Sequence, residues 1–381
     1  MKISKILFAA GAIALTIAVQ TPPVEAAAAD SQGKSLLKQV VEGARKEKQV
    51  YLYPTTSGSD EVTAGFRSYL KRLGLDLDLK VDATGGSFEK ISQAIGETKQ
   101  GIPPAYDVQF GGAHEIIHLL EANGAKRIEN LELLLGEIAA QAVPLLDKIS
   151  PGPFKGRAFT FGHWVKAIVY NTKLIAEKDL PRTHKDLGDA KFKGTYALPP
   201  WTSDADISLL TYDKDQALEI IKGMGRNKAA TERESAAVNR MLLGEFKFVD
   251  ANAHYYYEFK SRDAKAPVGL DFFRDYTTIN ESMYFVREGA LHPNAATLFV
   301  LWTLSADGQQ VFEKATFQPH LYLPSSKIGR EMAEMMKARK VKLVSYVDNE
   351  ESIKKLKWMS ETEEGKAWTQ AIARAWRGSG K

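Results

Sequence analysis

The chain has 381 residues, of which 44% are hydrophobic and 26% charged, and its formal net charge is +4. This composition is typical of a soluble globular protein, and the length suggests two or three domains. No lysine- or arginine-rich block is present, so we expect no nucleic-acid partner. The absence of cysteine excludes disulfides, a cysteine nucleophile and a lipid anchor attached to a cysteine.

The N-terminus predicts export. Lys2 and Lys5 precede an uncharged apolar run at residues 6–19, and alanines follow at 26–27. That order is typical of a cleaved signal peptide, and the run is shorter than the ~20 residues that span a bilayer. We therefore expect residues 1–26 to be a signal peptide and the mature protein to be periplasmic; an uncleaved anchor is the alternative.

Strand and helix patterns alternate along the rest of the chain. In the first half we expect a helix from Ser35, strands at 50–53, 75–81 and 106–110, and helices beginning near 59, 87 and 113. In the second half we expect strands at 164–170, 194–199, 246–249, 268–272 and 283–286, helices near 203, 217, 236, 293 and 308, and a helical C-terminal segment. Such alternation predicts an α/β fold with helices on the faces of each sheet.

The break in the pattern near residue 163 predicts two lobes. We place lobe I at 27–163, lobe II at 164–275, a return to lobe I at 276–335 and a C-terminal helical extension at 336–381. Ligands of open α/β sheets bind outside the carboxyl ends of the strands. Two lobes that face each other therefore predict a ligand cleft between them, closed by a hinge motion.

Several short motifs, in order, give the chain a family resemblance. It resembles the extracellular solute-binding proteins of family 1, of the ferric-iron-binding type, over roughly residues 45–325. The motifs are Tyr53-Pro54-Thr55-Thr56, Thr84-Gly85-Gly86, Ala105-Tyr106-Asp107-Val108, Val169-Tyr170-Asn171-Thr172 and His292-Pro293-Asn294-Ala295-Ala296.

The resemblance implies a type II periplasmic-binding fold, with a mixed sheet flanked by helices in each lobe. It also implies the substrate-binding component of an ABC importer, which binds a small-molecule or metal ligand and then docks on a membrane permease. We expect a monomer that is not an enzyme and holds no resident cofactor.

Two ligand classes follow from the resemblance. Iron-binding relatives ligate Fe(III) through two adjacent lobe II tyrosines, and counting back from Ala266-Pro267-Val268 places Tyr256 and Tyr257 there. Other relatives bind small organic or phosphorylated anions. The lobe I regions that carry a histidine and a carboxylate in iron binders hold neither here, so both classes stay open.

The residues themselves suggest how an anion is held. Glycines precede two predicted helices, whose N-terminal N–H groups favour negative charge. A serine begins a lobe II helix, and a lysine lies four residues before Tyr170. The expected ligand-binding residues are therefore Thr55, Thr56, Gly85, Gly86, Gly112, Lys166, Ser203, Tyr256 and Tyr257, with the two tyrosines as metal ligands only for ferric iron.

Two other functions remain as alternatives. The run His114-Glu115-Ile116-Ile117-His118 fits the H-E-x-x-H pattern of zinc metallohydrolases, in which two histidines share a helix face. A zinc site of that kind needs a third ligand, and none has a distinctive context. The second alternative is a ligand-binding subunit of a sensor system.

Overall fold

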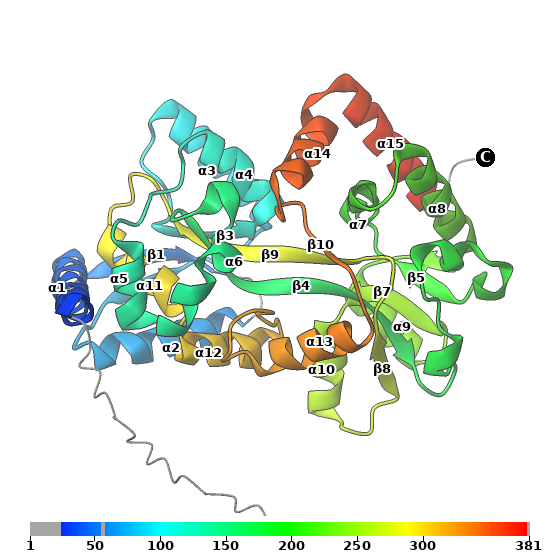
Figure 1. Cartoon of the computed structure of the whole chain (residues 1–381), viewed down its shortest axis with the longest axis horizontal. Coiled ribbons are helices and arrows are strands. Elements are labelled where there is room, and N and C mark those ends of the chain that lie inside the picture. The colour runs from blue at the N-terminus through cyan, green and yellow to red at the C-terminus, as the bar shows by residue number, and fades with distance from the viewer. Residues whose placement is uncertain (1–23, 55–57, 379–381) are drawn as a thin grey trace, which may run out of the picture.

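The computed structural model describes residues 24–54 and 58–378. Two α/β lobes lie end to end and are joined by the long strands β4 (Ala158–Asn171) and β9 (Thr277–Val286), which run through the centre of the molecule (Figure 1). One mixed sheet has the strand order β2-β1-β3-β9-β4-β7-β5-β6, with β10 beside β9 and β8 beside β4. The predicted two-lobed α/β fold is confirmed.

Lobe I is built on parallel strands that end at a common edge. β1 pairs in parallel with β2 and β3, and β3 pairs antiparallel with β9. One face of this sheet packs an aromatic core that includes Phe66, Tyr284 and Trp302. The elements of lobe I are β1 (Gln49–Tyr53), β2 (Asp78–Val81), β3 (Val108–Gly112), α2 (Ser59–Arg72), α3 (Ser87–Gln100), α4 (Ala113–Glu121), α5 (Leu131–Ile138), α6 (Leu146–Ile149), α11 (Pro293–Trp302) and α12 (Ala306–Thr316).

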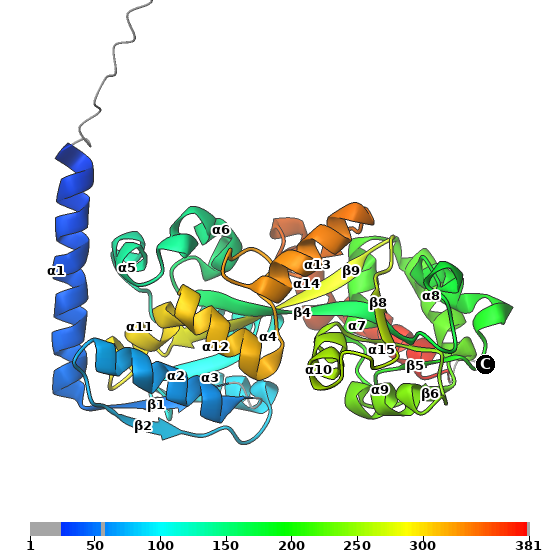
Figure 2. The same ribbon diagram turned by 90° about the horizontal axis from the view of Figure 1, so that it is seen from below.

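The first helix corrects one expectation. α1 spans Val24–Glu47, so it begins before Ser35, where we expected the first helix to start. Its partly buried Leu36, Leu37 and Val40 pack against the lobe I core, and it stands at the end of lobe I far from lobe II (Figure 2). Its first residues are rich in alanine, the strongest helix former, so the helix extends beyond the amphipathic part. Within the described residues, no helix is long and apolar enough to cross a membrane.

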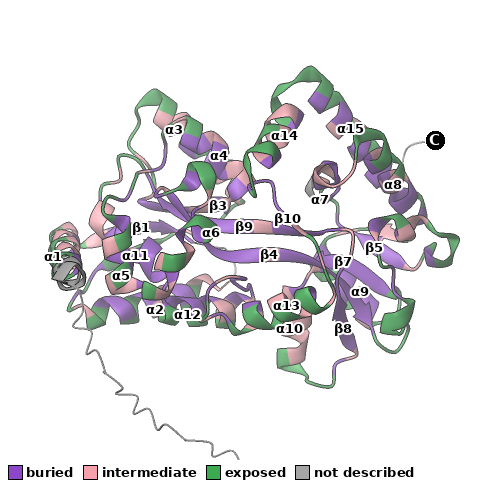
Figure 3. Ribbon diagram, viewed as in Figure 1, coloured by how far each residue is buried: buried purple, intermediate pink, exposed green. Residues whose placement is uncertain are grey.

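Lobe II repeats the arrangement on the other side of the long strands. β7 pairs antiparallel with β4, and β5 pairs in parallel with β7 and β6. Except for the short edge strand β6, these strands are almost wholly buried, as the colouring by burial shows (Figure 3). The elements are β5 (Tyr196–Leu198), β6 (Ala230–Thr231), β7 (Phe248–Asn252), β8 (Val268–Asp271), α7 (Ser203–Asp206), α8 (Lys214–Asn227), α9 (Glu234–Leu242) and α10 (His254–Arg262).

The C-terminal part of the chain contacts both lobes. α13 (Lys327–Ala338) packs on the lobe II core, and β10 (Leu343–Val344) pairs with β9. α14 (Glu350–Glu361) lies beside lobe I through an ion pair between Lys357 and Glu121. α15 (Glu363–Arg377) packs on α8, and its Trp376 Nε1 donates to the Pro199 carbonyl of lobe II at 2.7 Å. Figure 1 shows this pair of helices arching from the centre of the molecule to α8.

Candidate functional site

The strand register brings the carboxyl edges of the two lobes to face each other. Gly112, at the end of β3, pairs with Ser282 of β9, which pairs in turn with Gly162 of β4. Asn252, at the end of β7, pairs with Lys166 of β4. Because β7 runs antiparallel to β4, its end points back toward lobe I. Four residues of β4, about 13 Å of extended chain, separate the two edges.

In lobe I, both helices expected to bind an anion already hold their own carboxylates. Gly86 and Gly112 are the N-caps of α3 and α4, as expected. The Gly112 N–H donates to Glu115 Oε2 at 2.9 Å, and Ser87 Oγ donates to Glu115 Oε1 at 3.1 Å. A Cβ added at Gly86 would lie 2.3 Å from Glu89 Oε2, so that carboxylate also folds back over its helix end. An incoming anion would meet these two negative charges.

A second lobe I cluster follows the end of β2. The Lys90 ammonium lies 2.9 Å from Asp82 Oδ2 and donates to the Tyr106 hydroxyl at 2.6 Å. Hydrogen bonds from Thr84, Tyr106 and Lys90 hold the pKa of Asp82 well below its ordinary value. Tyr53, at the end of β1, donates to the Gly85 carbonyl at 3.1 Å. These bonds fix the loop before α3, and Asp82 neutralises the one lysine beside it.

In lobe II, Lys166 is buried rather than on the surface. Its ammonium lies 2.5 Å from Glu234 Oε1, and both side chains are almost fully covered. The Asn252 backbone N–H and side-chain Nδ2 donate to Glu234 Oε2 at 3.0 and 2.8 Å. The same ammonium lies 5.8 Å from the centre of the Trp201 ring. A buried ion pair with no net charge, held by further hydrogen bonds, therefore lies at the lobe II edge. We call the residues at this edge the lobe II half-site.

His254 and Tyr255, at the start of α10, complete the lobe II half. The His254 ring lies 5.0 Å from Trp164 and 3.9 Å from Tyr255. Burial, with the nearby Lys166 charge, lowers the pKa of His254 to about 3, so the ring is neutral at physiological pH. Burial, with the nearby Glu234 charge, raises the pKa of Tyr255 to about 12. Within the described part of the chain, His254 Nδ1 and Asn252 Oδ1 are buried without a hydrogen-bond partner.

The residues expected from sequence fall in different places. Gly85, Gly86 and Gly112 lie at the lobe I edge and Lys166 at the lobe II edge, as expected. Burial, with the nearby charge of Glu331 on α13, raises the pKa of Tyr256 and of Tyr257. Ser203 begins α7, but its side chain, like Thr55 and Thr56, lies outside the described residues.

The sequence analysis missed the residues that surround Lys166. Glu234 begins α9 and Asn252 ends β7, and neither belongs to a recognisable motif. Trp201 carried a usable signal, since it stands just after the carboxyl end of a predicted strand, whereas Trp164 begins one. His254 and Tyr255 directly precede the expected tyrosine pair in the chain.

The H-E-x-x-H motif does not form a zinc site around its two histidines. His118 Nδ1 lies 3.4 Å from Glu121 Oε2, which also pairs with Lys357. Among the described residues, the group of metal-type ligands that includes His118 contains Glu121 and Glu361, but not His114. His114 instead faces Tyr346, with ring centres 6.5 Å apart.

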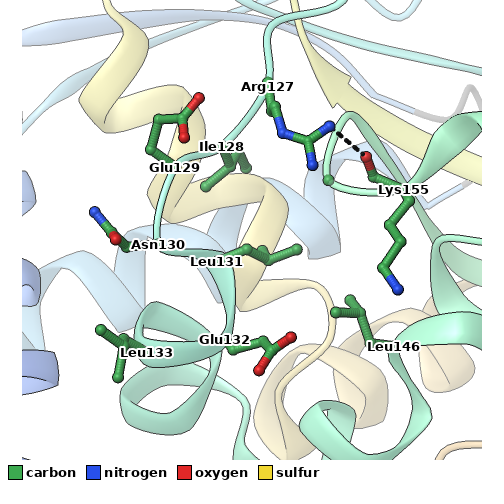
Figure 4. A pocket seen from close by; sticks show the side chains of 10 residues that line it. Arg127, Ile128, Glu129, Asn130, Leu131, Glu132, Leu133, Leu146 and Lys155 are labelled. Carbon is green, nitrogen blue, oxygen red and sulfur yellow. Dashed lines mark hydrogen bonds between the residues drawn. The ribbon is translucent and has the colours of Figure 1, made fainter. Parts of the chain in front are cut away.

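The hollow drawn in Figure 4 lies within lobe I, away from the inter-lobe edges. It has a volume of about 290 Å³, and the Arg127 guanidinium donates to the Lys155 carbonyl across it at 3.3 Å. Its lining comes from residues 127–133, 146, 155 and 156, so both walls belong to one lobe. A hinge motion between the lobes would not close it.

Two facing lobes joined by two strands define a two-lobed solute-binding protein. The chain belongs to the bacterial extracellular solute-binding proteins, whose family model matches residues 69–326. It is thus a solute-binding protein of the ABC-transporter type. Neither the metallohydrolase nor the sensor alternative is supported by this match.

Individual relatives are distant. An uncharacterized protein of Haemophilus influenzae is 24% identical over 296 residues, which cover 72% of this chain and 79% of that protein. Iron-bound HitA from Pseudomonas aeruginosa superposes with a TM-score of 0.66 at 17% identity, covering 85% of this chain and 98% of HitA. AfuA from Actinobacillus pleuropneumoniae, with bound fructose-6-phosphate, gives 0.61 at 18% identity, covering 82% and 97%. At such identities the likeness shows the fold alone.

Proposed function

We propose that this protein is the periplasmic substrate-binding component of an ABC importer. It captures a small solute between its lobes, closes by bending of β4 and β9, and presents the closed form to a membrane permease. The predicted signal peptide at 1–26 directs export, and the mature chain acts as a monomer without catalysis. The strand register carries the proposal, because it aims the carboxyl ends of β3 and β7 at each other across two continuous strands.

The hinge strands support a bending motion between two rigid bodies. A register shift interrupts the β4–β9 ladder between Thr160 and Gly162, just before the chain leaves lobe I. Bulges bend strands locally, and a glycine there gives the backbone further freedom. On either side, β4 is buried in the core of one lobe. Bending at this point would move the two lobes relative to each other.

The ligand sites proposed from sequence divide into two sets. Gly85, Gly86, Gly112 and Lys166 lie at the facing edges, where a solute would contact both lobes. Ferric iron held by Tyr256 and Tyr257 would need both phenols to lose protons. Burial and the charge of Glu331 disfavour this loss, because they raise the pKa of both tyrosines.

A binding and transport experiment tests the function. In a strain that lacks this protein, uptake of the ligand should fall and should return when the full-length chain is restored. A matched variant with the carboxyl edges intact but without residues 1–26 should bind the ligand in vitro and fail to restore uptake. Normal uptake in the deletion strain would contradict the proposed role.

A further inference from the structure

We propose that the transported solute is a small organic cation, held between Phe88 of lobe I and Trp201 of lobe II. The inference rests on the proposed function, since it assumes that the ligand lies between the lobes. Two exposed aromatic side chains, a buried acceptor without a donor, and two lysines already paired with carboxylates each support it.

Phe88 is an apolar helix residue whose side chain is mostly exposed. It lies three residues before the buried Ile91 and seven before Ile95, so it belongs to the apolar stripe by which α3 packs on lobe I. Nevertheless its side chain is 68% exposed. Phe88 lies in the first turn of α3, two residues after the N-cap Gly86. Its ring is therefore presented at the edge that faces lobe II.

Trp201 is the corresponding aromatic side chain of lobe II. It follows β5 at the carboxyl edge and is 40% exposed. The Lys166 ammonium, 5.8 Å from the ring centre, shows that this indole already accepts a positive charge on its surface. Tryptophan gives the strongest cation–π attraction among the aromatic residues. A cation that enters when the lobes close would meet Trp201 on one side and Phe88 on the other.

Hydrogen-bond acceptors lie around these rings in both lobes. In lobe II the buried Asn252 Oδ1 has no partner among the described residues. In lobe I the carboxylates of Glu89 and Glu115 cover the ends of α3 and α4. Buried acceptors without partners are costly, so a ligand that brings N–H donors gains most here.

The two lysines described above already have carboxylate partners. Lys166 is paired with Glu234, and Lys90 with Asp82. Each pair sums to zero charge, which leaves Glu89 and Glu115 as the uncompensated charges of the lobe I helix ends. The anion site expected from sequence would face those two carboxylates, whereas a cation is attracted by them.

Thermal unfolding of the mature chain with defined probes tests the inference. The cationic probes are spermidine, thiamine, choline and arginine; the anionic probes are phosphate, citrate and fructose 6-phosphate; ferric citrate tests iron. A cation should raise the melting temperature, and its affinity should fall as salt is added, because surface charge attraction is screened. Stabilisation by an anion or by iron, with no cation effective, overturns the inference and leaves the proposed function intact.

Matched variants locate the site. Trp201→Ala and Phe88→Ala should each weaken cation binding about tenfold, in line with the loss of one cation–π contact. Leu243→Ala is the control, because Leu243 is 81% exposed but follows the opposite end of α9 from Glu234. Unchanged affinity in both aromatic variants overturns the inference. If both variants weaken binding but the bound cation causes no lobe closure, the ligand class stands and the proposed function fails.

Discussion

The buried pair of Lys166 and Glu234 offers the sharpest test of how the lobe II half-site is built. Replacing Lys166 by Met keeps the stem of the side chain but leaves the Glu234 carboxylate without its cation. The two side chains are only 6% and 3% exposed, so water cannot take the place of the ammonium. Removing one partner of a buried pair typically costs ~3–5 kcal/mol.

The structure indicates that the cost of losing Lys166 lies at the lower end of this range. Glu234 keeps two hydrogen bonds from Asn252, which still satisfy one of its oxygens. We therefore expect Lys166→Met to lower the free energy of unfolding by about 3 kcal/mol, roughly a 150-fold change in the folding equilibrium. Urea unfolding, followed by the fluorescence of the nearby Trp164 and Trp201, measures the change.

Two further variants control the measurement. Lys214→Met removes the lysine of an exposed pair, Lys214 with Glu364, whose side chains are 47% and 71% exposed. That change should cost less than ~1 kcal/mol. Lys166→Met combined with Glu234→Leu replaces the whole buried pair by apolar groups and should recover most of the loss. If Lys166→Met costs no more than Lys214→Met, the pair is not buried as described and the argument fails.

Other parts of the molecule give further predictions. Burial raises the pKa of Glu281, on hinge strand β9, from 4.5 to about 7; the folded state therefore holds a proton that the unfolded state has lost between these pH values. Relative to Glu281→Gln, the wild type should lose about 3 kcal/mol of stability as the pH rises from 4.5 to 7, and parallel stability–pH curves would contradict this. Trp376→Ala should cost ~3–5 kcal/mol in urea unfolding, since the ring is 1% exposed; a cost below ~1 kcal/mol would show that α15 is not docked on lobe II. Tyr256→Phe with Tyr257→Phe should abolish ferric-citrate binding if iron is the ligand and leave the affinity for an organic cation unchanged. His118→Ala should leave ligand binding unchanged, and a loss of bound zinc or of peptidase activity in that variant would revive the hydrolase alternative.

The sequence predicted the fold well where local patterns determine structure. The glycines after two predicted strands correctly indicated where α3 and α4 begin, because a helix begins where the backbone turns away from the sheet. β9 was predicted only from Met283, whereas it begins at Thr277. Its first half is buried by contacts with β4 and β10, distant in the chain, and local periodicity cannot show such pairing.

The run of aromatic residues at 254–257 shows why the site residues could not all be predicted from the sequence. Residues 254–257 offer four aromatic rings in a row, and the sequence does not say which of them face the lobe I edge. The phase of α10 decides this: the helix begins at His254, so His254 and Tyr255 lie beside Lys166 and the next two rings turn toward α13. α13 was itself not predicted, although Ile328, Met332 and Met336 have helical spacing.

The C-terminal extension could be predicted as helical but not as a connection between the lobes. Its charges and tryptophans predict amphipathic helices, which pack on some apolar surface. Which surface they cover depends on the folded lobes: Lys357 reaches Glu121 of lobe I, and Trp376 reaches Pro199 of lobe II. Any closing motion must therefore carry α14 and α15 with it.

Small-angle X-ray scattering of the mature protein tests the central claim most directly. The claim is that a solute binds between the lobes and draws them together about β4 and β9. Adding a saturating amount of the ligand identified by thermal unfolding should lower the radius of gyration, and Trp201→Ala at the same ligand concentration should reduce that effect. An identical scattering curve for the free and the fully liganded wild-type protein would contradict the account.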